Sequence, residues 1–194
     1  MTTLFAEQTD GPSADEIQLA RDAISNIDAF TELYRRHITR VFRYHIVHAG
    51  NLKDAEDLTS QTFLAAMEGI RSFRGSSSFA AWIMGIATKK GLMHFRRRGN
   101  KSELPLDAAL HYPSPSLPTD KAALQRLQLE SIARALRKIS PERAEAISLS
   151  YFGGLSNSEI SRILNKSEAA VKMLISRGLQ DLRERTSLAL EVEL

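Results

Sequence analysis

The chain contains the stretch Leu155-Ser-Asn-Ser-Glu-Ile-Ser-Arg-Ile-Leu-Asn-Lys-Ser-Glu-Ala-Ala-Val-Lys-Met-Leu-Ile-Ser-Arg177. Its apolar spacing predicts two short helices that meet at a turn over residues 165–167. On the second helix, Lys172 and Arg177 lie on the side away from Val171, Leu174 and Leu182. A helix held by an apolar stripe, with cations and small polar groups on its other face, suits the major groove of DNA. Duplex DNA is therefore the first partner to consider.

The composition limits the other function classes. A length of 194 residues allows one large or two small domains with real cores. The chain has no cysteine, which excludes disulfides and thiolate metal sites. No apolar run is long enough to span a bilayer, and the first residues lack the features of a signal peptide. We therefore expect no membrane insertion and a cytoplasmic location.

The net charge of +3 is modest, but the charges are segregated along the chain. Residues 86–101 contain six Lys and Arg side chains and no carboxylate, whereas Asp54-Ala-Glu-Asp57 places three acids in four residues. A cationic cluster near aromatic residues is typical of a nucleic-acid surface. A solvated basic helix end is the structural alternative, and this segment alone leaves both open.

Apolar periodicity predicts helices from Phe30 to about Gly50, from about Asp54 to Ile70, and from Phe79 onward. Four of the six prolines lie between residues 102 and 120, so this segment is predicted to be a linker. No alternating β pattern competes. We predict an all-α protein with two helical domains joined by a flexible linker. The expected boundaries are a tail over 1–22, a first domain over 23–100, a linker over 101–121, a second domain over 122–187 and a tail over 188–194.

Three segments together resemble the extracytoplasmic-function (group IV) RNA polymerase sigma factors of the sigma-70 family. The stretch Asp54-Ala-Glu-Asp-Leu-Thr-Ser-Gln-Thr-Phe63 is similar to the acidic signature of region 2.2. Phe73-Arg-Gly-Ser-Ser-Ser-Phe-Ala-Ala-Trp-Ile-Met-Gly-Ile-Ala87, followed by three arginines, resembles regions 2.3 and 2.4. The segments 140–143 and 151–156, with Val171-Lys172, fit region 4.

The resemblance implies a division of labour between the domains. The first would bind the β′ clamp helices of core RNA polymerase and recognise the −10 promoter element as unpaired DNA. The second would read the −35 element as duplex and contact the β flap. An anti-sigma factor is a further candidate partner. No catalysis, cofactor or metal is expected, because the polymerase supplies the chemistry.

The candidate polymerase-binding residues follow the acidic signature: Asp54, Glu56, Asp57, Leu58, Gln61 and Phe63. Acids in a first helical turn also balance the helix dipole, which is the structural alternative for the first three.

The candidate −10 contacts combine a polar loop with the basic stretch: Arg74, Ser76, Ser77, Ser78, Phe79, Lys89, Lys90, His94, Arg96, Arg97 and Arg98. Serine hydroxyls can donate to and accept from base edges, although helix capping explains any single serine equally well. The cations are expected to neutralise phosphates. Trp82 is expected in the core.

The candidate −35 contacts lie on the second helix of the opening stretch: Ser167, Glu168, Ala169, Lys172, Met173, Ser176 and Arg177. Arg177 is the best candidate for a bidentate guanine contact, with a phosphate clamp as its alternative. Lys89, Met93, Met173 and Leu174 depart from the usual family residues, which leaves the preferred promoter sequence open.

Two other classes of function remain open. A helix-turn-helix regulator would bind duplex DNA without polymerase, which leaves the first domain unexplained. A sigma-like adaptor that sequesters an anti-sigma factor would keep the fold and lose the DNA contacts. His37, His45 and His48 share one helix, but no carboxylate or cysteine lies at a spacing that would complete a metal site. No catalytic triad order, P-loop or dinucleotide turn occurs, so we predict that the chain is not an enzyme.

Overall fold

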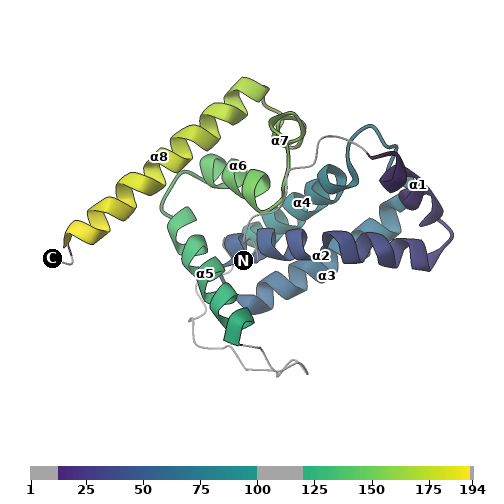
Figure 1. Ribbon diagram of the computed structural model, residues 1–194, viewed down its shortest axis with the longest axis horizontal. Helices are drawn as coiled ribbons and strands as arrows, with labels where there is room; N and C mark the ends of the chain where they lie inside the picture. The colour runs from purple at the N-terminus through teal and green to yellow at the C-terminus, as the bar shows by residue number, and fades with distance from the viewer. Residues whose placement is uncertain (1–12, 100–119, 193–194) are drawn as a thin grey trace.

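A computed structural model describes residues 13–99 and 120–192, without the side chains of 97–99, 120–123 and 185–192. Within these ranges every regular element is helical, which confirms the all-α prediction (Figure 1). None of the described helices is long and apolar enough to cross a membrane. The elements in order are α1 (Ala14–Asp22), α2 (Ile27–Ala49), α3 (Leu52–Gly69), the short 3₁₀ helix η1 (Ile70–Ser72), α4 (Phe79–Gly99), α5 (Asp120–Leu136), α6 (Pro141–Tyr151), α7 (Asn157–Leu164) and α8 (Glu168–Val192).

The first domain is built on α2, α3 and α4, which pack against one another. The side chains of Asn26 and Asn51 cap α2 and α3 by accepting a backbone N–H of the first turn. Between the two helices, Gly50 adopts a left-handed conformation with φ of 72°, which turns the chain back on itself. The fully buried residues at the centre include Leu33 and Ile83.

The N-terminal segment differs from the expectation. Residues 14–22, which the sequence assigned to a tail, form α1 and pack on α2 and α4. Only Ala20 of this helix is buried, so its apolar pattern is too sparse to be recognised. At the other end α8 continues to Val192, so the first five residues of the expected tail over 188–194 are helical.

The second domain contains α5 to α8. Ser156 and Glu159 form a reciprocal capping box at the start of α7. Asn165 ends α7 in the left-handed conformation, with φ of 51°, which places a turn within the predicted range 165–167. The helix α8 then crosses α6 at Gly178, where a Cβ atom would lie 2.7 Å from Ile147 Cδ1. This close approach fixes which face of α8 points outward.

The two domains pack directly on each other, because α5 and α6 lie against α2, and α7 lies against α4 (Figure 1). We call this packing the closed arrangement. The expected linker over 101–121 falls almost wholly outside the described residues.

Candidate polymerase and nucleic-acid interfaces

The acidic residues lie at the start of α3. Glu56, Asp57 and Gln61 are exposed on its outer face. Asp54 is partly buried, because Asn51 Nδ2 donates to its carboxylate at 2.8 Å and His94 Nε2 lies 3.5 Å from it. Asp54 therefore stabilises the helix start, as the structural alternative held, while its neighbours remain accessible.

Two of the six predicted polymerase-binding residues are part of the core. Leu58 is 1% exposed and Phe63 is 5% exposed, and Phe63 packs edge-on against Tyr34. The outer face of α3 instead presents Leu64 and Met67, which are 54% and 42% exposed. Met67 follows the buried Ala66 and is turned away from the core. Exposed apolar residues beside acids mark a surface for a partner. Periodicity in the sequence alone did not distinguish these exposed residues from core residues.

The loop over residues 74–78 joins η1 to α4. Arg74 and Ser76 are exposed, whereas Ser78 is fully buried. The Ser78 hydroxyl accepts the backbone N–H of Ala81 at 3.1 Å and donates to Glu159 of α7. Ser78 therefore caps the start of α4, which was the structural alternative for a serine of this loop. The second domain covers this end of the loop.

Phe79 begins α4 and is 1% exposed. Its ring contacts Phe73 and Trp82, with centroids 5.5 and 5.3 Å away. Trp82 belongs to this packed aromatic group, as expected. In the closed arrangement neither Phe79 nor Ser78 is accessible to a DNA base.

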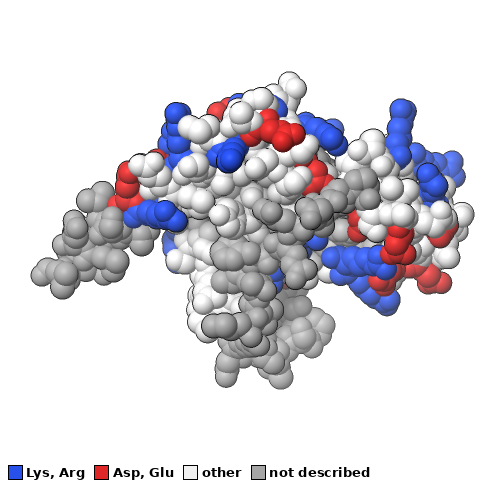
Figure 2. All heavy atoms as spheres, turned by 45° about the horizontal axis from the view of Figure 1, so that its top comes forward, with Lys and Arg blue, Asp and Glu red and all other residues white. Residues whose placement is uncertain are grey.

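The basic stretch lies on the second half of α4. Lys89 and Arg96 are exposed, and Lys90 is partly buried. His94 is partly buried, and its Nε2 atom faces the carboxylate of Asp54. Arg97 and Arg98 continue the helix, but their side chains lie outside the described part of the chain. Lysine and arginine side chains also project elsewhere on the surface, with acids interspersed (Figure 2).

The predicted −35 residues share the outward face of α8. Ser167 caps the helix by accepting the backbone N–H of Ala170 at 3.1 Å. The members of this face are all exposed, and they are Ser167, Glu168, Ala169, Lys172, Met173, Ser176 and Arg177. Val171 is fully buried on the opposite side, and an ion pair between Arg143 and Asp181 joins α6 to α8. The structure therefore brings this whole set together on one surface.

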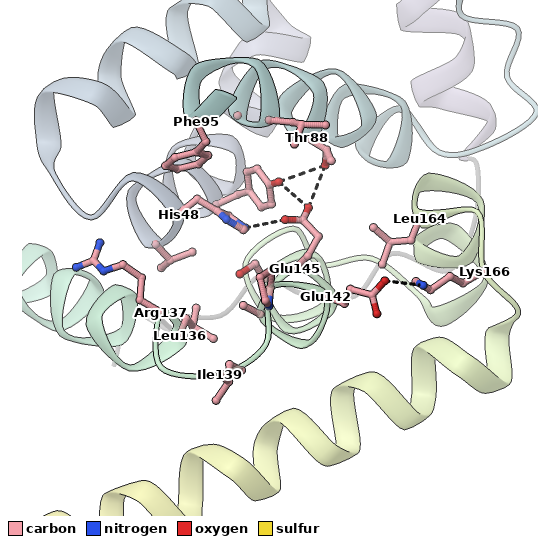
Figure 3. Close-up of a pocket in the computed structure, with 17 residues that line it drawn as sticks. His48, Thr88, Phe95, Leu136, Arg137, Ile139, Glu142, Glu145, Leu164 and Lys166 are labelled. Atoms are coloured by element: carbon pink, nitrogen blue, oxygen red, sulfur yellow. Dashed lines mark hydrogen bonds and ion pairs between the residues drawn. The ribbon is translucent and has the colours of Figure 1, made fainter. Parts of the chain in front are cut away.

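A cavity of about 650 Å³ lies between the domains and is lined by residues of α2, α4, α5, α6 and α7 (Figure 3). At one side, Tyr44 donates its hydroxyl to Glu145 Oε1 at 2.7 Å, and Thr88 Oγ1 lies 3.3 Å from the same oxygen. His48 Nε2 lies 3.3 Å from Glu145 Oε2. Burial lowers the pKa of His48, so this histidine is neutral near pH 7. Sequence reasoning identified none of these contacts, because they join residues of different domains that lie at least 57 positions apart.

The other histidines of α2 are also buried. His45 Nε2 donates to Thr62 Oγ1 at 2.9 Å, because the threonine hydroxyl is already used as a donor to Leu58 O. Burial lowers the pKa of His45 to about 3. His37 lies 2.8 Å from Glu16, and burial lowers its pKa despite that carboxylate. Among the described residues, no group of three His, Asp or Glu side chains is placed to hold a metal ion.

The sequence matches two family models, Sigma-70 region 2 over residues 33–101 and Sigma-70, region 4 over residues 129–182. The ECF RNA polymerase sigma factor SigE of Mycolicibacterium smegmatis is 30% identical over 93% of this chain and 70% of its own length. The chain belongs to the extracytoplasmic-function group of the sigma-70 family. A second relative of this sigma factor, the ECF sigma factor BldN of Streptomyces coelicolor, is 31% identical over 89% of the chain. The chain spans 66% of BldN's length.

The fold of this sigma factor is also found in a solved structure. CnrH in complex with the cytosolic domain of CnrY superposes with a TM-score of 0.70, covering 91% of this chain and 99% of CnrH at 24% sequence identity. The region 2 match contains the acidic start of α3, the loop and the basic stretch, and the region 4 match contains most of α8. Helix α1 precedes both matched ranges.

Proposed function

We propose that this sigma factor binds core RNA polymerase through α3, captures the −10 element as unpaired DNA with the loop over 74–78 and α4, and reads the −35 element as duplex with α8. The observation that carries the proposal is the grouping of seven exposed residues on one face of α8, in a chain that also has the accessible acids of region 2. The proposed domain boundaries are 23–100 for the first domain, 101–121 for the linker and 122–187 for the second domain.

For polymerase binding, the proposal rests on the outer face of α3. Asp57, Gln61 and Leu64 follow one another at four- and three-residue steps, so they share one exposed stripe. A stripe that combines acids with exposed apolar side chains suits a basic partner surface with an apolar centre. Leu58 and Phe63 support this stripe from the core instead of contacting the partner.

For DNA binding, the exposed cations provide the phosphate contacts and the two readout elements provide the specificity. Lys89 and Arg96 lie along α4, beyond the loop that carries Arg74 and Ser76. On α8, Lys172 and Arg177 are free to reach phosphates or base edges. In this proposal, α4 and the loop before it bind the unpaired −10 bases, and α8 binds the −35 duplex.

The closed arrangement has a consequence for this proposal. Arg162 of α7 donates to the carbonyl oxygen of Ser76 at 3.4 Å, so the −10 loop lies against α7, the helix that precedes the −35 helix α8. In the proposed function the two domains occupy separate sites along the promoter, with a stretch of duplex DNA between them. The two domains must therefore separate before both elements are bound, as the predicted linker between them would permit. The polymerase is the partner that would hold them apart.

The same chain offers a surface for an anti-sigma factor. The interdomain cavity is lined largely by apolar side chains from both domains, and Leu92 and Phe95 on its α4 side are 51% and 38% exposed. A protein bound there would favour the closed arrangement. A chain that only sequestered such a partner would use this surface without any DNA contact, and this is the second candidate function.

Transcription in vitro tests the proposal. Purified core polymerase, this chain and a promoter library randomised over both elements should give transcripts from a defined subset of promoters. A helix-turn-helix regulator that does not bind polymerase would give the core enzyme no promoter-specific initiation. A sequestering adaptor would give none either. Because the polymerase supplies the chemistry, we infer no catalytic role for the chain itself, and a cytoplasmic location follows from that of the polymerase. Failure to bind core enzyme would contradict the proposal.

A further inference from the structure

Helix α1 contacts both ends of the loop over 74–78. Ile17 packs directly on Gly75, where a Cβ atom would lie 3.2 Å from Ile17 Cγ2. Gly75 also has φ of 71°, which a residue with a side chain adopts only at a cost. One residue earlier on α1, Glu16 accepts a hydrogen bond from the backbone N–H of Phe79, the residue that starts α4. Neighbouring residues of α1 thus fix the beginning and the end of one loop.

Glu16 is itself held from the other side. Its carboxylate accepts His37 Nε2–H at 2.8 Å, and the His37 side chain is 3% exposed. The His37 ring also packs on Phe79, with centroids 5.1 Å apart. A carboxylate at the first N–H groups of a helix satisfies a backbone donor and complements the helix dipole. Glu16 therefore acts as an N-terminal cap for α4, although it comes from a different helix.

The loop has few other supports within the first domain. Ser78 Oγ caps the N–H of Ala81, and the Ser78 carbonyl accepts the N–H of Trp82. The second domain adds the contacts of Arg162 with Ser76 and of Glu159 with Ser78. When the domains separate, those contacts are lost, and α1 remains the element that holds the loop. The loop residues that face solvent would then depend on Glu16 and Ile17 for their position.

We infer that Glu16 and Ile17 are positioning residues that set the geometry with which the loop over 74–78 selects the unpaired −10 strand. The inference rests on the proposed function of the loop. It adds a determinant of promoter choice that lies outside the two matched regions. Helix α1 contributes no side chain to the DNA in this account, because its two key residues are turned toward the loop and α4.

The test uses holoenzyme reconstituted from core polymerase and the full chain, with a single-stranded DNA library randomised over the −10 window. Glu16→Ala and Ile17→Ala should each weaken capture of the oligonucleotides preferred by the parent about tenfold and broaden the selected set, which is the size of effect expected when one base contact is lost. Affinity for core polymerase and for −35 duplex should stay within about twofold. Glu16→Gln keeps an acceptor for the Phe79 N–H and should retain most of the selectivity.

Asp15→Ala is the matched control. Asp15 lies on the same helix and pairs with Arg36 at 3.0 Å on the exposed side, away from the loop. A change in the ratio of two competing sequences cannot come from a smaller folded fraction, so this ratio separates positioning from stability. Trp82, the single tryptophan, contacts Phe79 and gives a second readout, because its emission should shift in Glu16→Ala and not in Asp15→Ala.

Arg74→Ala, a change in the loop itself, separates the two hypotheses. If Arg74→Ala weakens capture while Glu16→Ala and Ile17→Ala select the same sequences as the parent, the inference is overturned and the proposed function stands. If Arg74→Ala and Ser76→Ala together leave capture unchanged, the loop does not read DNA, and both statements are overturned.

Discussion

Tyr44 of the first domain donates its hydroxyl to Glu145 of the second domain at 2.7 Å, across an interface between residues 101 positions apart. Tyr44 is 2% exposed, and burial together with the Glu145 carboxylate raises its pKa well above the usual value. The phenol therefore remains protonated and donates at every physiological pH. This hydrogen bond joins the surfaces that must separate when both promoter elements are bound.

Glu145→Ala should shift the free protein toward separated domains. The substitution leaves the buried Tyr44 hydroxyl without its closest acceptor, and losing such a partner costs about 1–3 kcal/mol. The chain has no cysteine, so the exposed Ser60 and Ser176 can be replaced by cysteine for one pair of fluorescent labels. Energy transfer between these labels should fall in Glu145→Ala. Glu142→Ala is the control, because Glu142 pairs with Lys166 inside the second domain at 2.9 Å. Equal transfer in the two variants would contradict a role for Glu145 in closure.

Asp57→Arg should abolish binding to core polymerase without unfolding the protein. Asp57 is exposed on the outer stripe of α3, and a charge reversal there places a cation against a basic partner surface. The free energy of unfolding should change by only about 0.5 kcal/mol, as is usual for surface positions. Asp28→Arg, in the exposed first turn of α2, is the matched reversal and should bind normally. Co-purification with core enzyme measures the difference, and retained binding by Asp57→Arg would remove α3 from the docking surface.

Arg177→Ala should distinguish a guanine contact from a phosphate clamp. If Arg177 binds a guanine, the change costs about 1–3 kcal/mol and relaxes selection at one base pair of the −35 element. Lys172→Ala should instead weaken binding to all sequences and lower the salt dependence by about one phosphate contact. Gln180→Ala on α8, whose partner is Glu184 of the same helix, should change neither. Selection from a duplex library at two salt concentrations decides between the outcomes. Uniform weakening by Arg177→Ala would assign it to a phosphate.

The sequence predicted the elements whose signals are local. The turn predicted over residues 165–167 is present, with Asn165 in a left-handed conformation, and the exposed face of α8 contains the residues assigned to it. Both predictions depend on spacing within one helix or on the conformational preference of one residue. The resemblance to the acidic signature, by contrast, assigned Leu58 and Phe63 to an interface, because a family motif contains core residues as well as surface residues.

The sequence did not predict features that depend on contacts between distant segments. Helix α1 has one buried residue, so its packing on the loop is not visible in a periodic pattern. The closed arrangement depends on complementarity between side chains such as Tyr44 and Glu145, which no local rule brings together. Ser78 is a second example of a contact that the sequence does not predict. Its hydroxyl is buried and donates to Glu159 because α7, which is distant in the sequence, lies beside it.

Histidine burial should make the stability of the protein depend on pH between about 3 and 6.5. His45 is fully buried, and burial lowers its pKa from 6.5 to about 3, so it remains neutral in the folded state. The unfolded chain binds a proton at this position as the pH falls below 6.5, while the folded chain does not. The unfolded state then holds more protons, so the free energy of unfolding falls as the pH is lowered, by up to about 1.4 kcal/mol per pH unit for one histidine. His37 and His48 act with the same sign, because burial lowers their pKa values too.

His45→Gln should reduce this dependence. A glutamine amide can still donate to Thr62 and does not titrate, so the slope of unfolding free energy against pH should decrease by up to one proton. Urea unfolding between pH 5 and pH 7 measures the slope and avoids the range in which carboxylates titrate. His111→Gln changes a histidine of the predicted linker and serves as the composition-matched control. An unchanged slope in His45→Gln would mean that His45 binds its proton equally in both states, and the buried neutral imidazole would have to be abandoned.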